Sequence, residues 1–178
     1  MKISDITETT INEEIELFKR LISSHIFTLM SNFLPVSSVD FFKQQLQQYN
    51  YDSFIKAILN KIFLFARGEI TLSNRDEETL MQQACDTICS IMWSSPASAA
   101  HCTINWTEWV KTPLGFAIKA CYARVKDTLT CEELGILLGY SRQEISRRAK
   151  HNLLPHKKVG GSYVFFKKEL IKKDILPA

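Results

Sequence analysis

Five side chains between residues 142 and 150 have the types and the spacing to contact DNA bases. They are Arg142, Gln143, Ser146, Arg147 and Lys150, and positions three or four apart share one face of an α-helix. Arginine can donate two hydrogen bonds to guanine, glutamine can pair with adenine, and serine can bond to bases or to phosphate. The pattern therefore predicts a helix surface that reads base pairs in the major groove of duplex DNA.

Two short helices must hold this surface in place. Thr130 with Glu133, and Ser141 with Glu144, each have the spacing of a capping box, so one helix is expected to start after Thr130 and another after Ser141. Gly139 between them is expected to end the first helix. The apolar residues expected to face inward are Leu134, Leu137, Leu138, Ile145 and Ala149. This arrangement is typical of a helix-turn-helix.

A β-hairpin is predicted next along the chain. Residues 159–165 place Gly160 and Gly161 between β-forming residues, which is a hairpin signal. Lys157 and Lys158 precede it, and their ammonium groups suit phosphate contacts. We expect this hairpin to serve as the wing of a winged helix-turn-helix.

The charge of this region favours a nucleic-acid partner. Residues 140–173 contain ten Lys or Arg and two Glu. Within them, residues 167–173 are expected to form a short basic helix with Leu170 and Ile171 turned inward. The alternative is that two packed helices and a hairpin serve protein contacts, since a fold alone does not imply a function. An excess of positive charge on this scale argues for DNA.

The segment also resembles the excisionase-like and MerR-like winged helix-turn-helix domains. The matching residues are Leu129, Thr130, Glu133, Leu134, Leu138, Gly139, Ser141, Arg142, Ile145, Leu154, Pro155, Lys158, Val159, Gly160, Gly161, Phe165, Glu169 and Leu170. The resemblance implies that the helix after the turn enters the major groove, and that the hairpin lies on the flanking backbone or minor groove. Gly135 stands where the family usually has alanine, and we expect it to weaken its helix.

We therefore expect a sequence-specific double-stranded DNA-binding protein, a bacterial or mobile-element transcription regulator. Two other functions stay open. One is an architectural factor for recombination directionality or plasmid maintenance, and the other is an effector or toxin-antitoxin subunit that acts through a protein partner. The residues expected to contact DNA are Thr130, Ser141, Arg142, Gln143, Ser146, Arg147, Lys150, Lys157, Lys158, Gly160, Gly161, Ser162 and Tyr163.

Charge divides the chain into two parts. Residues 1–105 hold eight Lys or Arg against twelve Asp or Glu, whereas residues 106–178 hold fourteen against seven. The small, uncharged residues 94–100 fall near this change of sign and are typical of a linker. We expect a mainly α fold in two domains: a helical bundle over 1–93, a linker over 94–105, and a winged helix-turn-helix with a small β-hairpin over 106–178.

The first part is expected to be helical throughout. Thr10 and Glu13 have capping-box spacing before a long helix that Pro35 ends, and a second helix is expected over 37–49. Asp52 is expected to cap a third helix, which Gly68 closes, and a fourth is expected over 74–93. In the second part, Thr112 and Pro113 begin a helix that reaches Lys126. Its apolar stripe, expected to brace the helix-turn-helix, is Leu114, Ala117, Ile118, Cys121 and Val125.

An apolar seam runs along the first of these helices. Its residues are Ile11, Ile15, Phe18, Ile22, Leu29 and Phe33. The seam fits either the core of the bundle or a surface for a partner helix, and the pattern does not decide between them. We expect a homodimer held by residues 1–93, because specific DNA binding normally recruits two copies of such a module.

Four metal-ligand types lie near one another in the sequence, so a zinc site is an alternative to be tested. They are Cys85 and Cys89, one helical turn apart, and the adjacent His101 and Cys102. Cysteine is often a small buried residue, and adjacent His-Cys is not a usual ligand pair, so we expect core packing and no metal. The odd count of five cysteines favours reduced thiols.

Catalysis, cofactors and a membrane are not expected. The sequence has no phosphate-binding or dinucleotide-binding glycine motif, no nucleophile elbow and no metal-binding His-Glu helix. We therefore expect neither an enzyme nor a bound cofactor. The acidic amino terminus is unlike a signal peptide, and no apolar run is long enough to span a bilayer, so we expect a cytoplasmic protein.

Overall fold

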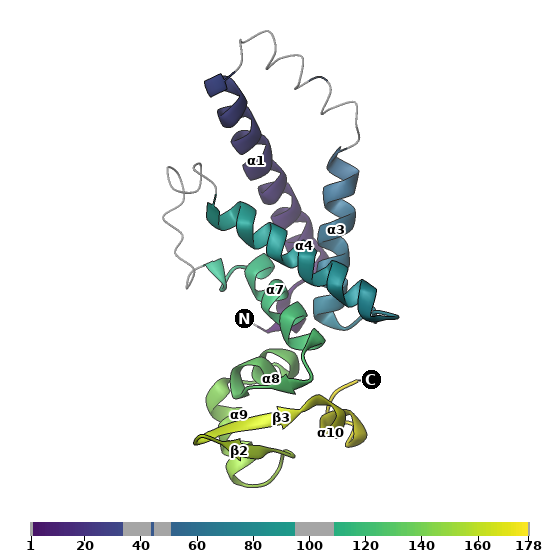
Figure 1. Ribbon diagram of the computed structural model, residues 1–178, viewed down its shortest axis with the longest axis vertical. Coiled ribbons are helices and arrows are strands. Elements are labelled where there is room, and N and C mark those ends of the chain that lie inside the picture. Colours follow the sequence, from purple (N-terminus) through teal and green to yellow (C-terminus); the bar gives the residue numbers. More distant parts are fainter. Residues whose placement is uncertain (1, 34–43, 45–50, 95–108, 178) are drawn as a thin grey trace.

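The fold is mainly α-helical, and the described residues include a small antiparallel sheet (Figure 1). A computed structural model of the chain describes residues 2–33, 44, 51–94 and 109–177. Its helices are η1 (Ile3–Asp5), α1 (Glu8–Phe33), α3 (Tyr51–Arg67), α4 (Arg75–Ser94), α7 (Pro113–Val125), α8 (Cys131–Leu138), α9 (Arg142–Lys150) and α10 (Lys167–Lys172). Its strands are β1 (Thr128–Leu129), β2 (Lys157–Val159) and β3 (Ser162–Phe166).

Helices α1, α3, α4 and α7 share one hydrophobic core (Figure 1). The four seam residues of α1 whose side chains are described are all buried in it: Ile11, Ile15, Phe18 and Ile22. Of the two interpretations of the seam, the intramolecular core is therefore correct for these residues. These four side chains are therefore not available for pairing with a second copy, and Leu29 and Phe33 of the seam lie outside the described side chains.

The start of α1 differs from the expected one. The helix begins at Glu8, and its cap is Thr7 instead of the predicted Thr10. The Thr7 hydroxyl accepts a hydrogen bond from the Thr10 backbone N–H at 3.3 Å. Ile6, just before Thr7, and Ile11 four residues after it are buried in the same core. Such an apolar pair fixes the entry of the chain into a helix, which places the cap at Thr7.

The other helix starts show where a sequence pattern is reliable. Asn74 caps α4, since its side-chain oxygen accepts the Glu77 N–H at 2.9 Å. Thr112 caps α7 as expected, by accepting the Gly115 N–H at 3.2 Å. Asp52, by contrast, lies inside α3, whose described part begins at Tyr51, so it is not the cap.

Helix α7 packs on both parts of the molecule. Most of its predicted stripe, namely Leu114, Ala117, Ile118 and Cys121, is buried in the core with α1, α3 and α4. The same helix also contacts α8, as a brace should. The Arg124 side chain donates to the Ala66 carbonyl oxygen of α3 at 3.0 Å, and burial lowers the pKa of its guanidinium. The division of the chain into two domains stays a prediction.

The sheet has the strand order β1-β3-β2, and all its pairs are antiparallel. The β2–β3 hairpin turns at Gly160 and Gly161, whose φ angles are 54° and 85°. Positive φ at both positions is what a two-residue type I′ turn requires, and glycine adopts it without strain. Strand β1 was not predicted, because a two-residue strand carries no alternation to detect.

Several predictions fall outside the described residues. They concern the end of the first helix at Pro35, the helix over 37–49 apart from residue 44, the linker beyond residue 94, and His101 and Cys102. None of the helices in the described part of the chain combines the length and the apolar character needed to cross a membrane.

Candidate nucleic-acid interface

Helices α8 and α9 are joined by a tight turn that leaves little free space. Gly139 ends α8 with a φ of 72°, and the Tyr140 N–H then donates to the Gly135 carbonyl oxygen at 2.9 Å. A Cβ atom at Gly135 would lie 2.6 Å from the Tyr140 oxygen. Glycine at this position therefore lets the turn fold back on the helix, and it does more than weaken α8.

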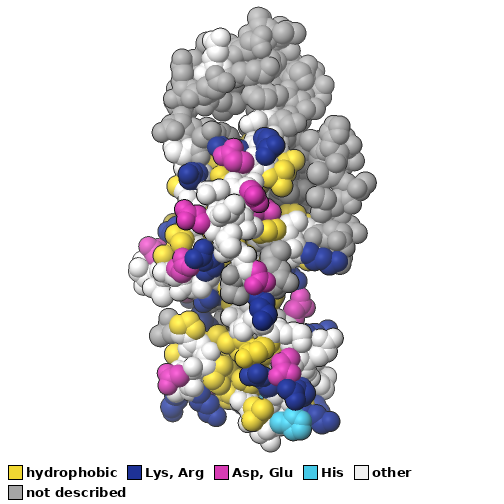
Figure 2. Space-filling view, turned by 180° about the vertical axis from the view of Figure 1, so that it is seen from behind, with side chains coloured by type: hydrophobic (Ala, Val, Ile, Leu, Met, Phe, Trp, Pro, Cys, Tyr) yellow, Lys and Arg dark blue, Asp and Glu magenta, His cyan; other side chains and the backbone are white. Residues whose placement is uncertain are grey.

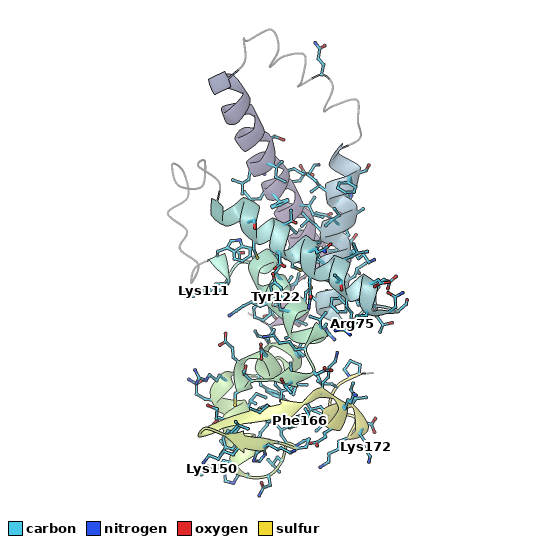
Figure 3. The ribbon with its side chains drawn as sticks, in the orientation of Figure 1. Arg75, Lys111, Tyr122, Lys150, Phe166 and Lys172 are labelled. Carbon is cyan, nitrogen blue, oxygen red and sulfur yellow. The ribbon has the colours of Figure 1, made fainter. Side chains whose placement is uncertain are left out.

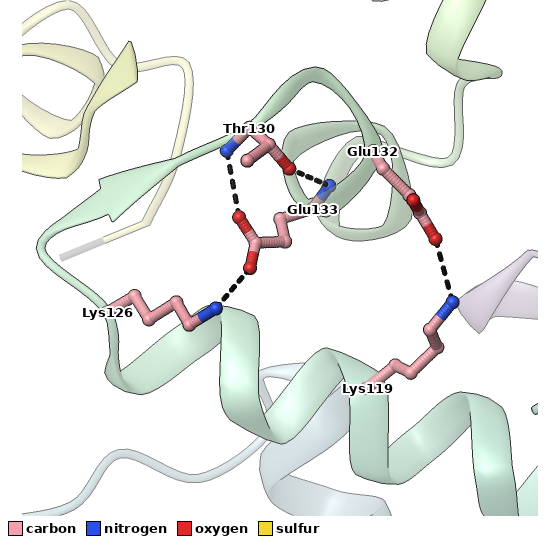
Figure 4. A network of polar contacts seen from close by, with 5 residues as sticks. All are labelled: Lys119, Lys126, Thr130, Glu132 and Glu133. Atoms are coloured by element: carbon pink, nitrogen blue, oxygen red, sulfur yellow. Dashed lines mark hydrogen bonds and ion pairs between the residues drawn. The ribbon is translucent and has the colours of Figure 1, made fainter. Parts of the chain in front are cut away.

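The start of α8 carries the predicted capping box in full (Figure 4). The Thr130 hydroxyl accepts the Glu133 N–H at 3.3 Å, and the Glu133 carboxylate accepts the Thr130 N–H at 2.8 Å. Glu133 also pairs with Lys126, and Glu132 pairs with Lys119 at 2.7 Å, so α8 is tied to α7 at two points. Burial alone would raise the pKa of Glu133, but the bonds from Lys126 and Thr130 hold that pKa below its ordinary value.

Helix α9 separates its buried and polar residues as the sequence predicts. Ile145 and Ala149 are fully buried, whereas the polar residues are on the other sides of the helix. Arg142, Gln143, Arg147 and Lys150 are exposed, and Ser146 is half-buried. Ser141 caps the helix, with its hydroxyl accepting the Glu144 N–H at 3.1 Å.

A polar cleft lies between α9, the start of α8 and the hairpin. Its volume is about 410 Å³. The lining residues are Thr130, Cys131, Glu132, Arg142, Ser146, Gly161, Ser162, Tyr163 and Val164. Six of them belong to the set expected to contact DNA, so the fold brings together residues more than thirty positions apart in sequence. Neither Gln143, Arg147 nor Lys150 lines this cleft.

The hairpin supplies further exposed groups. Lys157, Lys158, Gly160, Gly161 and Ser162 are exposed, and Lys158 pairs in register with the half-buried Tyr163. The Lys157 ammonium group lies 4.9 Å from the centre of the Phe166 ring, a cation–π distance. The His156 ring meets the Tyr163 ring edge to face at 4.9 Å. These aromatic contacts join β3 to β2 and to the residue just before it.

Three residues outside the predicted set turn out to organise α9. Glu144 pairs with Arg147 and with Arg148, and the Arg148 guanidinium carbon lies 4.0 Å from the centre of the Tyr140 ring. The bonds from Arg147 and Arg148 lower the pKa of Glu144 to about 2. Only the first half of the predicted Ser141–Glu144 capping box forms, because both carboxylate oxygens of Glu144 bind arginine.

Basic side chains gather at the end of the molecule that the C-terminal residues form (Figure 2). Lys150, which ends α9, and Lys172, which ends α10, both lie at this end (Figure 3). Leu170 of α10 is fully buried and Ile171 partly buried, as expected, and Lys168 and Lys172 of that helix are exposed. The positive charge thus surrounds α9 and the hairpin.

Two of the four described cysteines are packed in the hydrophobic core of the bundle. Cys85 and Cys121 are buried in the bundle core, and the Cys121 thiol lies 3.4 Å from the Ile62 carbonyl oxygen, to which it donates. The hydrogen bond with Cys85 and burial raise the pKa of the Cys121 thiol. Among the described residues, no three metal-ligand side chains gather in one place. His101 and Cys102 of the zinc alternative are not among those residues.

Comparisons of the chain with models of protein families, with curated proteins and with solved structures found no match.

Proposed function

We propose that this chain is a sequence-specific double-stranded DNA-binding protein, with residues 128–172 acting as a winged helix-turn-helix. In this proposal α9 enters the major groove, and the β2–β3 hairpin is the wing on the flanking backbone or minor groove. The observation that carries the proposal is the arrangement of α9. Its apolar residues are fully buried, and its hydrogen-bond donors are exposed on a helix capped at Ser141. A rigid element that presents such donors suits base readout.

The charge and the cleft add support. Ten Lys or Arg against two Glu over residues 140–173 favour a polyanionic partner. The cleft beside α9 is lined by hydroxyl groups, by Arg142 and by the glycine turn of the hairpin, and its one carboxylate, Glu132, is paired with Lys119. Hydroxyl and guanidinium donors of this kind bind phosphate oxygens, which would fix the register of α9 on the duplex.

We further propose that the protein is a bacterial or mobile-element transcription regulator that acts in the cytoplasm as a homodimer. One module buries modest surface on DNA, so high specificity favours two copies. Phe54 of α3 and Leu80 of α4 support pairing through the bundle, because their side chains are about two-thirds exposed. An apolar cavity of about 300 Å³ lies between α1, α3 and α4, with Phe54 in its lining.

Selection of bound sequences from random duplex DNA tests the proposal. Enrichment of an inverted repeat is the expected result for a dimeric regulator, whereas a direct array would favour an architectural role. Absence of any enriched sequence would contradict specific readout. Light scattering on the protein, free and bound to the enriched duplex, tests pairing, and a monomer in both conditions would rule out the homodimer.

The same apolar surface also fits the second candidate class, an effector or toxin-antitoxin subunit that works through a protein partner. Purification from its native host distinguishes the two. A stoichiometric second protein that protects Phe54 from solvent would favour this class, and a chain that copurifies only with itself would favour the regulator.

A further inference from the structure

Glu144 links two arginines of α9 to each other. Its Oε2 accepts from Arg147 Nε at 2.9 Å, and its Oε1 accepts from Arg147 Nη2 at 2.9 Å. The same Oε1 accepts from Arg148 Nε at 2.8 Å. Arg148 in turn stacks on the Tyr140 ring at 4.0 Å. A continuous set of contacts therefore runs from the turn before α9, through Arg148 and Glu144, to Arg147.

The pairing uses only one edge of the Arg147 guanidinium. A guanidinium carries five N–H donors in a rigid plane, and the bonds to Glu144 engage the edge formed by Nε and Nη2. The outer edge, formed by Nη1 and the second N–H of Nη2, has two parallel donors left. Two parallel donors match the O6 and N7 acceptors of guanine. The Arg147 side chain is 67% exposed, so solvent or a ligand can reach it.

Arg148 differs from Arg147 in what it can reach. Its side chain is only 34% exposed, and it is held by both Glu144 and the Tyr140 ring. We expect Arg148 to act on its neighbours, because its guanidinium has less freedom to turn toward a ligand. Arg148 then fixes Glu144, and Glu144 fixes the plane of Arg147.

We propose that Glu144 is a positioning residue for base readout: it holds the Arg147 guanidinium so that its outer edge meets one guanine of the bound duplex. The inference rests on the proposed DNA-binding function. It adds to that function the base that is contacted and the residue that orients Arg147. Glu144 itself would not touch DNA. A long arginine side chain that is oriented before binding loses less rotamer freedom on contact, which sharpens discrimination between bases.

A purely structural role for Glu144 predicts a different result. Glu144 lies in the first turn of α9, where a carboxylate favours the helix dipole, and its pair with Arg147 spans three residues on one face. Loss of such support would lower the stability of the protein and its affinity for every duplex alike. Loss of positioning would instead lower the preference for guanine at one base pair.

The test uses the full-length chain, the duplex enriched by selection, a scrambled duplex, and a panel in which each G·C pair of the enriched duplex is replaced by A·T. Arg147→Ala should lower the preference for one G·C pair by about tenfold. Glu144→Ala should lower the preference at that same pair on the order of fivefold. It should leave binding to the scrambled duplex unchanged or stronger, because a negative charge has been removed.

Glu169→Gln is the matched control, since it removes an acidic charge from the basic region at α10 and leaves the Arg147 contact intact. Glu169→Gln should strengthen binding to all duplexes alike and keep the preference for guanine. The double variant, which carries both Glu144→Ala and Arg147→Ala, should show the same preference for that G·C pair as Arg147→Ala alone. Circular dichroism checks that every variant is folded, and Glu144→Gln, which keeps one acceptor oxygen, replaces Glu144→Ala if that variant does not fold.

The outcomes separate the two proposals. If the enriched duplex binds specifically but the Glu144 variants keep the full guanine preference, the positioning role is wrong and the proposed function stands. The same conclusion follows if the effects of the two substitutions simply add. If no duplex binds better than the scrambled one, the proposed function itself fails, and the positioning role fails with it.

Discussion

Gly135 in the middle of α8 packs against the backbone of Tyr140, and its carbonyl oxygen accepts a hydrogen bond from the Tyr140 N–H at 2.9 Å. A Cβ atom at residue 135 would come within 2.6 Å of the Tyr140 carbonyl oxygen, which is closer than such atoms pack. The backbone fixes the positions of both the Cβ atom and the Tyr140 oxygen, so a side-chain rotation cannot relieve the contact. The turn between α8 and α9 therefore depends on the absence of a side chain at this position.

Gly135→Ala should destabilise the protein. In an open helix the change would gain up to about 1 kcal/mol, but forcing a methyl group into a packed site costs roughly 1 to 3 kcal/mol. We expect a net loss, measured as a lower midpoint in urea denaturation. Ser90→Ala on the exposed side of α4 is the control and should change the midpoint little. A higher midpoint for Gly135→Ala would show that the turn has room.

Glu133→Gln should lower stability at neutral pH and have little effect in acid. The folded-state pKa of Glu133 lies below its ordinary value, so its carboxylate contributes stability above the unfolded-state pKa, and that contribution is lost as the pH falls through the folded-state pKa. Because the group is partly exposed, we expect less than about 1 kcal/mol. Urea denaturation of both proteins between pH 7 and pH 3 measures the difference. A gap that widens in acid would contradict the assignment.

Arg147→Ala and Lys158→Ala should weaken DNA binding in different ways. Loss of Arg147 should cost roughly 1 to 3 kcal/mol on the specific duplex and flatten preference at one base pair. Lys158 lies exposed on β2, and under the proposed function its ammonium group is expected to bind phosphate, so its loss should weaken binding to all duplexes and reduce the salt slope by about one. Binding titrations at several salt concentrations measure both. Equal losses on specific and scrambled duplexes for Arg147→Ala would refute base readout by this residue.

A fragment of residues 106–178 should fold but associate with itself. Leu114, Ile118 and Cys121 of α7 are buried against α1, α3 and α4 in the whole chain, and the cut would expose them. Circular dichroism should show helix, and sedimentation should show oligomers. The same fragment with Leu114→Gln and Ile118→Gln is the control and should be monomeric. An unfolded fragment would place α7 and the residues after it in one continuous domain with the bundle.

Local signals predicted much of this fold. Thr130 with Glu133, Thr112 with Pro113, and Gly160 with Gly161 each act over a few residues, so their structures follow from backbone chemistry that the sequence contains. The true cap of α1 was missed because it depends on Ile6 and Ile11 packing into a core that is built from distant helices.

The sequence predicted which side chains of the candidate site are exposed on α9, but it did not predict their arrangement. The apolar residues of α9 identify its buried side, and the predicted division of α9 into a buried and an exposed side is confirmed. Nothing in the sequence shows that Thr130 and Tyr163 border one cleft, because that depends on how the hairpin packs against α8. Likewise, the capping-box spacing of Glu144 concealed its pairing with two arginines, since a carboxylate with several partners in reach binds the strongest donors.

The position of α7 in the bundle core, with α8 tied to it by Lys119 and Lys126, affects how the molecule melts. If one half of the molecule unfolded alone, the apolar surface that it covers at α7 would be exposed on the half that stayed folded, so a state with only one half folded is unfavourable. The chain should then lose its structure in one transition, as cooperative units do. A ligand bound only to α9 and the hairpin would by mass action slow amide exchange in α3, far from any contact it makes.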